Sequence, residues 1–366
     1  MRALDTAVIY ENPLPQLRSR QSFFPSLCRL SDGRLAAAVV IGQAFESVDS
    51  TSCICFSDDE GLTWSAPKPM FDKSGYPCPV TDYCKLTPLP DGRLLAFGYA
   101  FPRPEEEKPL GNPKTGGLLE DFIFYALSQD NGESWGPMQP VPCAWGPHVE
   151  ASAPATVLAD GTWVSPITGF ADWDGNSTGP MCGRLLRSED QGKSWQDDAI
   201  CMDLGGNVTC FEQRLCALAD GTLVCIGWNE DITTGQRLPN HFTASFDGGK
   251  TWTRPETTGV MGQASSLCAL GGQRFLAIHA VRRDTDKPGI YGYVVDFSQR
   301  TWNVVDSALL WAPAVPVTQE KHMAEIFSFL KFGQPSAMVL DDKNLLLCHW
   351  FAQDGQYRTV ATRIAL

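Results

Sequence analysis

The sequence is short of positive charge and has no cluster of it. Its 29 lysines and arginines stand against 42 aspartates and glutamates, which gives a formal net charge of −13. A surface that follows nucleic-acid phosphates needs concentrated positive charge, so we expect no nucleic-acid partner. Long apolar runs are missing too, both the roughly 18 residues of a membrane span and the run of a secretion signal. These absences favour a soluble, cytoplasmic protein without a membrane partner.

A CxxC pair is also absent, although the chain holds 13 cysteines, an odd number. They are scattered through apparent strands such as "CICF" (53–56) and "LVCIGW" (223–228). Cysteine in such places behaves as a small buried hydrophobe, so we expect reduced thiols in a reducing compartment. The five histidines show no ligand spacing. We therefore expect no disulfide framework, no metal and no other cofactor.

What the sequence does have is a repeat. Six segments, of which "PSLCRLSDGRLAAAV" (25–39) is the first, bring one apolar run to a tight turn and leave it on a second. Asp-Gly, the turn in four copies, is the strongest short signal for a β-hairpin because both residues tolerate positive φ. The spacing of 52 to 70 residues allows four short strands per copy, as in a propeller blade. The turns begin at Asp32, Asp91, Asp160, Asp220, Gly272 and Asp342.

A second motif follows four of these hairpins. It reads "SDDEGLTW" (57–64), "SQDNGESW" (128–135), "SEDQGKSW" (188–195) and "SFDGGKTW" (245–252). We expect it to be the turn between the third and fourth strands of a blade. In the first copy Asp59 would accept backbone N–H groups, Gly61 would supply backbone freedom and Trp64 would pack between blades. The motif therefore builds the frame.

The sixth repeat lacks this motif, and the chain ends on "YRTVATRIAL" (357–366), which reads as a third strand. We expect "DTAVIYE" (5–11) to supply the fourth strand and close the ring, which leaves no open edge. The segment 101–121, rich in proline, glycine and charge, reads as a long loop of the second blade. The predicted fold is all-β, a single six-bladed β-propeller domain over residues 1–366.

The four motifs and six turns resemble the Asp-box, or BNR, repeat of the sialidase superfamily. The resemblance implies a sialidase-like six-bladed propeller that hydrolyses glycosidic bonds. Asp49 stands where that family has its acid/base aspartate, and Glu212 where it has a glutamate in the fourth blade. The Arg-Ile-Pro motif of the family falls on "FFP", with Phe23 at the arginine. Its second arginine falls at Trp228, and its tyrosine at Gln334 or Pro335.

Inner strands of a propeller end at one central pocket, so residues eight to ten before each turn should converge there. Glycosidic cleavage needs one carboxyl as acid and another as base or nucleophile. We assign Asp49 as acid and Glu212 as base or nucleophile, with Asp82 and Glu150 in reserve. The expected pocket residues are Phe23, Asp82, Tyr83, Glu150, Phe211, Glu212, Gln263, Gly333 and Gln334.

The leading hypothesis is a glycosidase for a small oligosaccharide that does not contain ordinary sialic acid, because the guanidinium cluster for a sugar carboxylate is missing. One alternative is a true exo-sialidase whose clamp is rebuilt from Arg18, Arg20, Arg282 and Arg283. Another is a non-catalytic propeller that binds a glycan or a protein. A polysaccharide lyase would use Tyr83 or His148 as base. Loop charges such as Glu325 and Lys331 are weaker candidates, and homo-oligomerisation stays open.

Overall fold

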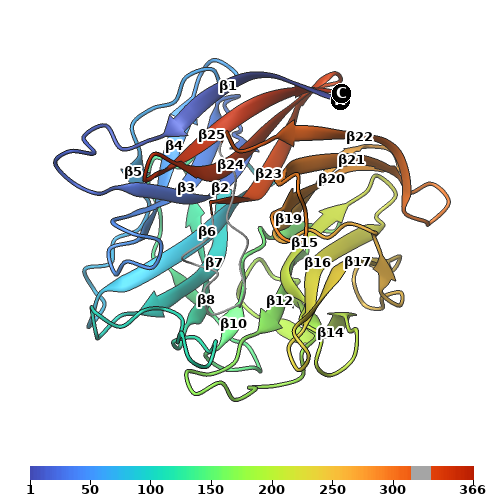
Figure 1. The fold of residues 1–366 in the computed structure, drawn as a ribbon, viewed down its shortest axis with the longest axis horizontal. Helices are drawn as coiled ribbons and strands as arrows, with labels where there is room; N and C mark the ends of the chain where they lie inside the picture. The colour runs from blue at the N-terminus through green and yellow to red at the C-terminus, as the bar shows by residue number, and fades with distance from the viewer. Residues whose placement is uncertain (315–330) are drawn as a thin grey trace.

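The computed structural model describes residues 1–314 and 331–366, which form six antiparallel sheets arranged as blades round one axis (Figure 1). The prediction of a six-bladed propeller is confirmed. Blade 1 is β2 (Gln21–Arg29), β3 (Leu35–Gly42), β4 (Thr51–Ser57) and β5 (Lys68–Pro69). Blade 2 is β6 (Val80–Pro88), β7 (Leu94–Pro102), β8 (Phe122–Ser128) and β9 (Gln139–Val141).

Blade 3 differs in that its inner strand is split into two short pieces, which both pair with the next strand. It consists of β10 (Val149–Glu150), β11 (Thr156–Val157), β12 (Trp163–Gly169), β13 (Gly183–Ser188) and β14 (Gln196–Met202). Blade 4 is β15 (Phe211–Ala217), β16 (Leu223–Asp231), β17 (Gln236–Ser245) and β18 (Glu256–Thr257). Blade 5 is β19 (Ser265–Gly271), β20 (Arg274–Val281), β21 (Gly289–Asp296) and β22 (Asn303–Trp311).

Blade 6 closes the ring with strands from both ends of the described chain, as the sequence predicts. It consists of β23 (Phe332–Asp341), β24 (Asn344–Gln353), β25 (Gln356–Ala365) and β1 (Arg2–Tyr10). β1 pairs antiparallel with β25, with Val8 opposite Val360, and the Thr6 and Thr362 hydroxyls lie 3.0 Å apart. In Figure 1 the blue first strand accordingly lies beside the red last strands. This pairing removes the open edge that β25 would otherwise present.

The core lies between the blades rather than within any one of them. One apolar cluster joins Ile54 of blade 1 to Leu94 and Phe124 of blade 2. Another joins Leu35 of blade 1 to Leu346 of blade 6. Each blade therefore buries its faces against two neighbours, and the ring is stabilised mainly by this apolar burial.

The Asp-box motifs join the third and fourth strands of blades 1 to 4, as predicted. In blade 1 the Asp59 carboxylate accepts the Thr63 N–H at 2.9 Å and the Thr63 hydroxyl at 2.6 Å. Gly61 has φ +86°, and a Cβ there would lie 2.7 Å from Leu346 of blade 6. Trp64 packs in the cluster that contains Leu346, so the motif fastens one blade to the next.

Blade 5 carries a remnant of the motif that the sequence analysis missed. The segment "DFSQRTW" (296–302) occupies the same turn between β21 and β22 but lacks the glycine. Trp302 still packs, with its ring centroid 4.8 Å from Phe242 and 5.3 Å from Phe275. The tryptophan therefore fills the space between blades 4 and 5 even where the hydrogen-bonded turn has changed.

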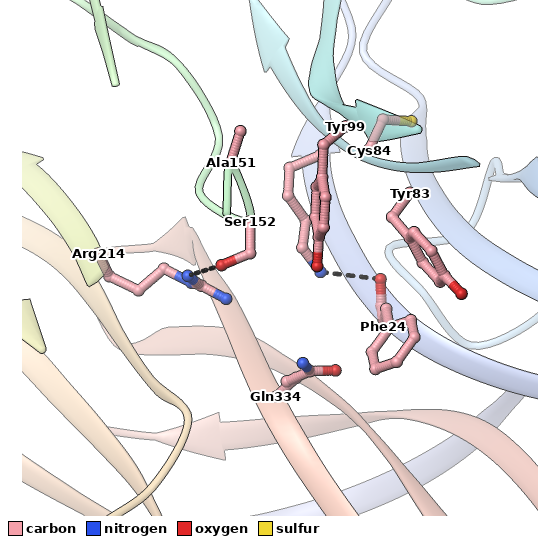
Figure 2. Close-up of a pocket in the computed structure, with 9 residues that line it drawn as sticks. Phe24, Tyr83, Cys84, Tyr99, Ala151, Ser152, Arg214 and Gln334 are labelled. Carbon is pink, nitrogen blue, oxygen red and sulfur yellow. Dashed lines mark hydrogen bonds between the residues drawn. The ribbon is translucent and has the colours of Figure 1, made fainter. Parts of the chain in front are cut away.

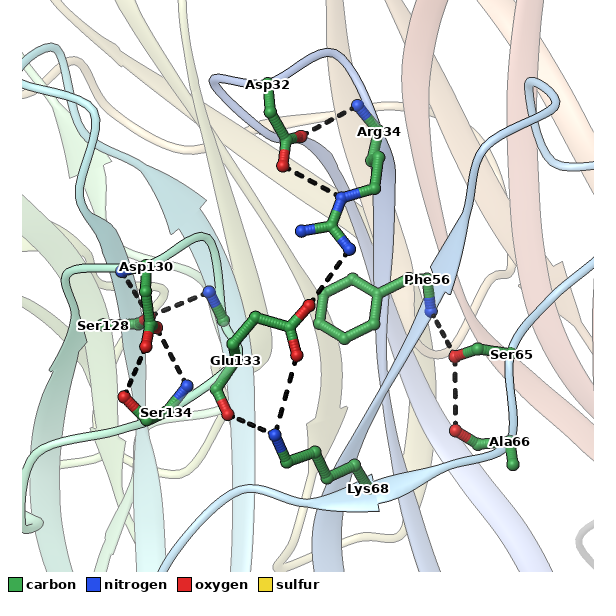
Figure 3. A network of polar contacts seen from close by, with 11 residues as sticks. Asp32, Arg34, Phe56, Ser65, Ala66, Lys68, Ser128, Asp130, Glu133 and Ser134 are labelled. Carbon is green, nitrogen blue, oxygen red and sulfur yellow. Dashed lines mark hydrogen bonds and ion pairs between the residues drawn. The ribbon is translucent and has the colours of Figure 1, made fainter.

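Polar contacts also cross between blades at the surface, as Figure 3 shows for blades 1 and 2. Arg34 bonds Asp32 of its own turn at 2.9 Å and Glu133 of the next blade's Asp-box at 3.1 Å. Lys68 donates to the main-chain carbonyl of Glu133. Exposed ion pairs of this kind stabilise a fold by at most about 1 kcal/mol each, so they add little to the packing between blades.

Two further expectations concern features of the whole chain. All 13 cysteines are free, and most are buried, as predicted. In the described part of the chain, no helix has the length and hydropathy of a membrane span. The segment 103–121 joins β7 and β8, where a long loop is predicted.

Candidate functional site

Three inner strands carry an irregularity at the same place, and all three irregular residues face the axis. Phe24, Glu212 and Gln334 have φ of 53°, 46° and 45°, and each lies at a register shift between the first two strands of its blade. Each also stands eight residues before its hairpin turn. A bulge re-aims a side chain and positive φ is costly for such residues, which makes these positions candidates for function.

Phe24 and Gln334 line a central cavity on the axis (Figure 2), and Glu212 is hydrogen-bonded to Gln334. Its volume is about 30 Å³, room for about two water molecules. Five blades contribute to the walls. The described residues that line the cavity are Phe24, Tyr83, Cys84, Lys85, Tyr99, Ala151, Ser152, Arg214 and Gln334.

Glu212 accepts hydrogen bonds from two N–H donors of different blades, one of which is the cavity residue Gln334. Its Oε1 accepts the Gln334 side-chain amide at 2.6 Å, and its Oε2 accepts the Trp228 indole at 2.9 Å. Trp350 in turn donates to the carbonyl oxygen of Gln334 at 3.2 Å, which orients the amide nitrogen toward Glu212. The carboxyl is partly exposed and fixed in direction, as a reacting group needs to be.

Glu150 lies next to Glu212 and is 4% exposed. Its Oε2 accepts the backbone N–H of Glu212 at 2.9 Å, and its Oε1 accepts the Ser152 hydroxyl. Ser152 also accepts Nη1 of Arg214 at 2.9 Å. Burial, and next the charge of Glu212, raise the pKa of Glu150 to about 7. The two carboxyl groups therefore sit in different environments, which is how one of a pair is kept as an acid.

Two tyrosines, an arginine and a lysine complete the walls. The rings of Tyr83 and Tyr99 lie 5.6 Å apart, and burial raises the pKa of both phenols. Among the described residues, the Tyr99 hydroxyl makes no hydrogen bond. Arg214 brings positive charge to the same walls, and Lys85 adds an amine. The central cavity thus combines phenol, guanidinium and amine groups, and the two carboxyl groups contact its wall residues.

Of the residues predicted for the pocket, Tyr83 and Gln334 line the central cavity, whereas Glu150 and Glu212 contact its wall residues Ser152 and Gln334. Phe211 packs on Trp228 with ring centroids 5.2 Å apart, directly beside Glu212.

Gln263 is buried just before β19 of blade 5, where its Oε1 accepts Nε of Arg282 at 2.8 Å. Arg282 also donates to the carbonyl of Phe332, and Arg283 pairs with Glu230 at 3.2 Å. Both arginines are thus engaged in bonds between strands. This engagement gives no support to a rebuilt carboxylate clamp.

Two predicted residues point away from the central cavity. Phe23 has no exposed surface and packs in an aromatic cluster with Phe45, because the bulge turns its neighbour Phe24 to the axis instead. Asp82 is also fully buried, paired with Lys73 at 2.7 Å. Successive residues of a strand face opposite sides, so Tyr83 takes the axial position and Asp82 the interface between blades.

Asp49, the predicted acid, lies in the loop between β3 and β4, and Arg18 and Arg20 lie exposed between β1 and β2. None of the three is among the described residues of the cavity wall. Burial acts to raise the pKa of Asp49, but hydrogen bonds from Gln43 and Ser47 outweigh it and lower the pKa. The catalytic role of Asp49 stays a prediction, and Glu325 lies outside the described residues.

Sequence reasoning missed Phe24, Lys85, Tyr99, Ser152 and Arg214. Counting eight or six residues back from each hairpin turn finds four of them. Residues eight before the turns include Phe24 and Ser152, and residues six before include Lys85 and Arg214, because alternate residues share a face. Tyr99 comes from a second strand, which the count does not reach.

Comparisons with known proteins agree with this architecture. A family model described as "BNR repeat-like domain" matches residues 73–287, more than half of the chain. The chain belongs to the BNR repeat-like domain family. No curated protein matches it in sequence. Among the described residues, no group of three or more His, Cys, Asp or Glu could hold a metal ion.

Solved structures with the same fold include sialidases. A protein of unknown function from Dyadobacter fermentans DSM 18053 has 20% identity and a TM-score of 0.73, over 100% of this chain and 99% of that one. The Hadza microbial sialidase Hz136 has 16% identity and a TM-score of 0.66, over 94% of this chain and 66% of that one. The Trypanosoma rangeli sialidase in complex with the inhibitor DANA has 16% identity and a TM-score of 0.61, over 100% of this chain and 58% of that one. At such identities the likeness shows the fold alone.

Proposed function

We propose that this BNR repeat-like protein is a glycoside hydrolase that cleaves a small oligosaccharide at the central cavity. The observation that carries the proposal is the pair of neighbouring carboxyl groups, Glu150 and Glu212, in unlike surroundings. Glycoside hydrolysis needs one carboxyl that donates a proton to the leaving oxygen and a second that acts as base or nucleophile.

Glu150 takes the part of the acid in this proposal. Its pKa of about 7 keeps a large fraction of it protonated near neutral pH. Asp49, the acid predicted from the sequence, is the alternative, although its pKa is shifted in the opposite direction. An Asp49→Asn variant separates the two assignments, because it loses activity only if Asp49 supplies the proton.

Glu212 acts directly, either on a water molecule or on the sugar. The sialidase resemblance expects a tyrosine at Gln334 or Pro335, and here the amide of Gln334 contacts Glu212. The cavity, at about 30 Å³, has room for the attacking water. A monosaccharide is several times larger, so its binding requires side chains that line the cavity, such as Phe24 and Tyr99, to move apart.

The decisive experiment compares Glu212→Gln with the wild type on a panel of aryl glycosides that includes neutral sugars and a sialoside. We expect the wild type to cleave a neutral glycoside and Glu212→Gln to lose at least about 10²-fold in rate. The control is Glu256→Gln, which makes the same change at an exposed site on the outer strand of the same blade. Equal rates in all three proteins, or no cleavage by the wild type, contradict the proposal.

A polysaccharide lyase is the second candidate, and one observation favours it. The Tyr99 hydroxyl, without a hydrogen-bond partner among the described residues, lies in the same cavity as Arg214. A phenol base and a cation that neutralises a uronate are what β-elimination needs. The product would absorb in the ultraviolet, and Tyr99→Phe would abolish that signal while Glu212→Gln would not.

We also propose that the protein works in the cytoplasm. The support is that all 13 cysteines are free, as in proteins of reducing compartments. Fractionation of the native source with an antibody tests this location.

A further inference from the structure

Lys85 is a buried lysine without a counter-ion. Its side chain is 7% exposed and lines the central cavity. Among the described residues, no carboxylate pairs with it; its Nζ donates instead to the carbonyls of Phe24 at 2.8 Å and Pro25 at 2.9 Å. Lys73, in contrast, pairs with Asp82 at 2.7 Å.

The surroundings of Lys85 favour the neutral amine. Burial, and next the charge of Arg214, lower its pKa to about 7, against weaker opposite effects from Cys348, Cys84 and Glu212. A neutral amine has two hydrogens and one lone pair. Two carbonyl acceptors use both hydrogens, and the lone pair is left over, as in a nucleophile.

A purely structural role has to be considered first. The bulge between β2 and β3 takes Phe24 and Pro25 out of the regular ladder, and Lys85 satisfies the carbonyls that are freed. An arginine could also do this without an ionisable amine. A role beyond structure is indicated because the amine lies in a cavity wall with two phenols and a guanidinium. Figure 2 shows Tyr83, Tyr99 and Phe24, whose carbonyl accepts the Lys85 amine, beside one another at the cavity.

We propose that Lys85 is a covalent binding site for a small carbonyl compound, a 2-oxo acid in particular, which it holds as an imine. The Nζ lone pair attacks the carbonyl carbon, and the carbonyl π electrons move to oxygen. A proton passes from nitrogen to that oxygen, which gives a carbinolamine. The carbinolamine then loses one water molecule and leaves a C=N bond, so no oxidant or reductant is needed.

The neighbouring groups match these steps. The hydroxyls of Tyr83 and Tyr99 line the same cavity and can relay the proton that leaves with the water. Arg214 uses Nη1 for Ser152 and for the Gln213 carbonyl, at 2.9 and 2.7 Å. Its Nε and Nη2 make no hydrogen bond among the described residues, so they are available to the carboxylate of a 2-oxo acid.

The test is reductive trapping on the full chain. Native protein is incubated at pH 7 with glyoxylate and cyanoborohydride, which reduces an imine to a stable secondary amine, and the modified lysines are found by peptide mass spectrometry. An ordinary lysine is neutral in only about 1 in 2,500 molecules at pH 7, whereas Lys85 is neutral in about half. Allowing for restricted access, we expect Lys85 to react at least about tenfold faster than Lys73 or an exposed lysine.

Three controls make the result decisive. Lys85→Arg keeps the donors to both carbonyls and should lose the label. Glu212→Gln should keep it, which separates this site from the proposed hydrolysis. Glycolaldehyde, which lacks a carboxylate, should label Lys85 more slowly than glyoxylate. Modification of Lys85 no faster than Lys73, or only after the protein is unfolded in urea, would overturn the proposal.

Discussion

The carboxylates at the rim of the propeller and those on its axis respond to folding in opposite ways. The pKa of each Asp-box aspartate, Asp59, Asp130, Asp190 and Asp247, is lowered to about 2, chiefly by hydrogen bonds from the turn. The pKa of Glu150 on the axis is raised to about 7 by burial. Donors stabilise a carboxylate and an apolar surrounding opposes it. The repeated carboxylates thus suit the frame, and the one on the axis suits proton transfer.

Glu150→Gln gives the largest effect on activity that this contrast predicts. We expect kcat/KM to fall by about 10² to 10⁴-fold, the contribution of a general acid. In the wild type, activity should decline as pH rises through about 7, because Glu150 loses its proton, and this limb should vanish in the variant. A pH–rate profile of both proteins tests it. If the alkaline limb of the profile is unchanged in the variant, a residue other than Glu150 is the acid.

The same variant should gain stability at alkaline pH. The pKa of Glu150 is 4.5 in the unfolded chain and about 7 in the folded state, so between these pH values only the folded state keeps the proton. The free energy of unfolding therefore decreases as the pH rises from about 4.5 to about 7. Removing the charge relieves this cost, which is about 3 kcal/mol at pH 8. Urea unfolding at pH 5 and pH 8 measures it. If the urea midpoint of the variant differs from that of the wild type by the same amount at both pH values, the raised pKa of Glu150 is contradicted.

Gln334→Leu should have a smaller effect on activity. It removes the N–H donor to Glu212 and the acceptor of Trp350, while the carboxyl itself remains. A hydrogen bond to a charged group is worth about 1.5–3 kcal/mol, so we expect kcat to fall about tenfold to a hundredfold with KM little changed. Gln139→Leu, on the exposed β9, is the matched control. A change confined to KM would show that Gln334 binds substrate rather than orienting Glu212.

Asp247→Asn should leave activity unchanged and lower the thermal midpoint by a few degrees. The carboxylate of Asp247 accepts the Thr251 N–H at 2.9 Å and its hydroxyl at 2.6 Å. Its pKa is lowered in the folded state, so its contribution is present above about pH 4 and is lost as pH falls toward about 2. Thermal scans at pH 7 and pH 2.5 should therefore show a difference that disappears in acid. Lost activity at an unchanged midpoint would break the contrast between rim and axis.

The repeated features could be predicted from the sequence because each is local. Asp-Gly turns, the Asp-box and the closure by β1 all follow from short patterns, and a count from the turn places Tyr83, Glu212 and Gln334 at the axis. Phe23, chosen from the family's Arg-Ile-Pro position, lies nine residues before its turn and is buried, whereas Phe24, eight residues before it, reaches the cavity at the bulge.

Properties that depend on several blades could not be predicted. The burial that raises the pKa of Glu150 comes from neighbours far apart in sequence, as does the position of Tyr99 on β7. Trp302 was missed because its turn has lost the glycine by which the motif is recognised.

Closure of the ring by β1 has a consequence for how the molecule forms. Thr6 and Thr362, whose side chains meet across β1 and β25, are separated by 356 positions. During synthesis, β1 therefore remains unpaired until β25 has been made. Contacts over such separations slow folding and leave a strand edge exposed to other chains in the meantime. The newly made chain should therefore depend on chaperones until β25 is available to pair with β1.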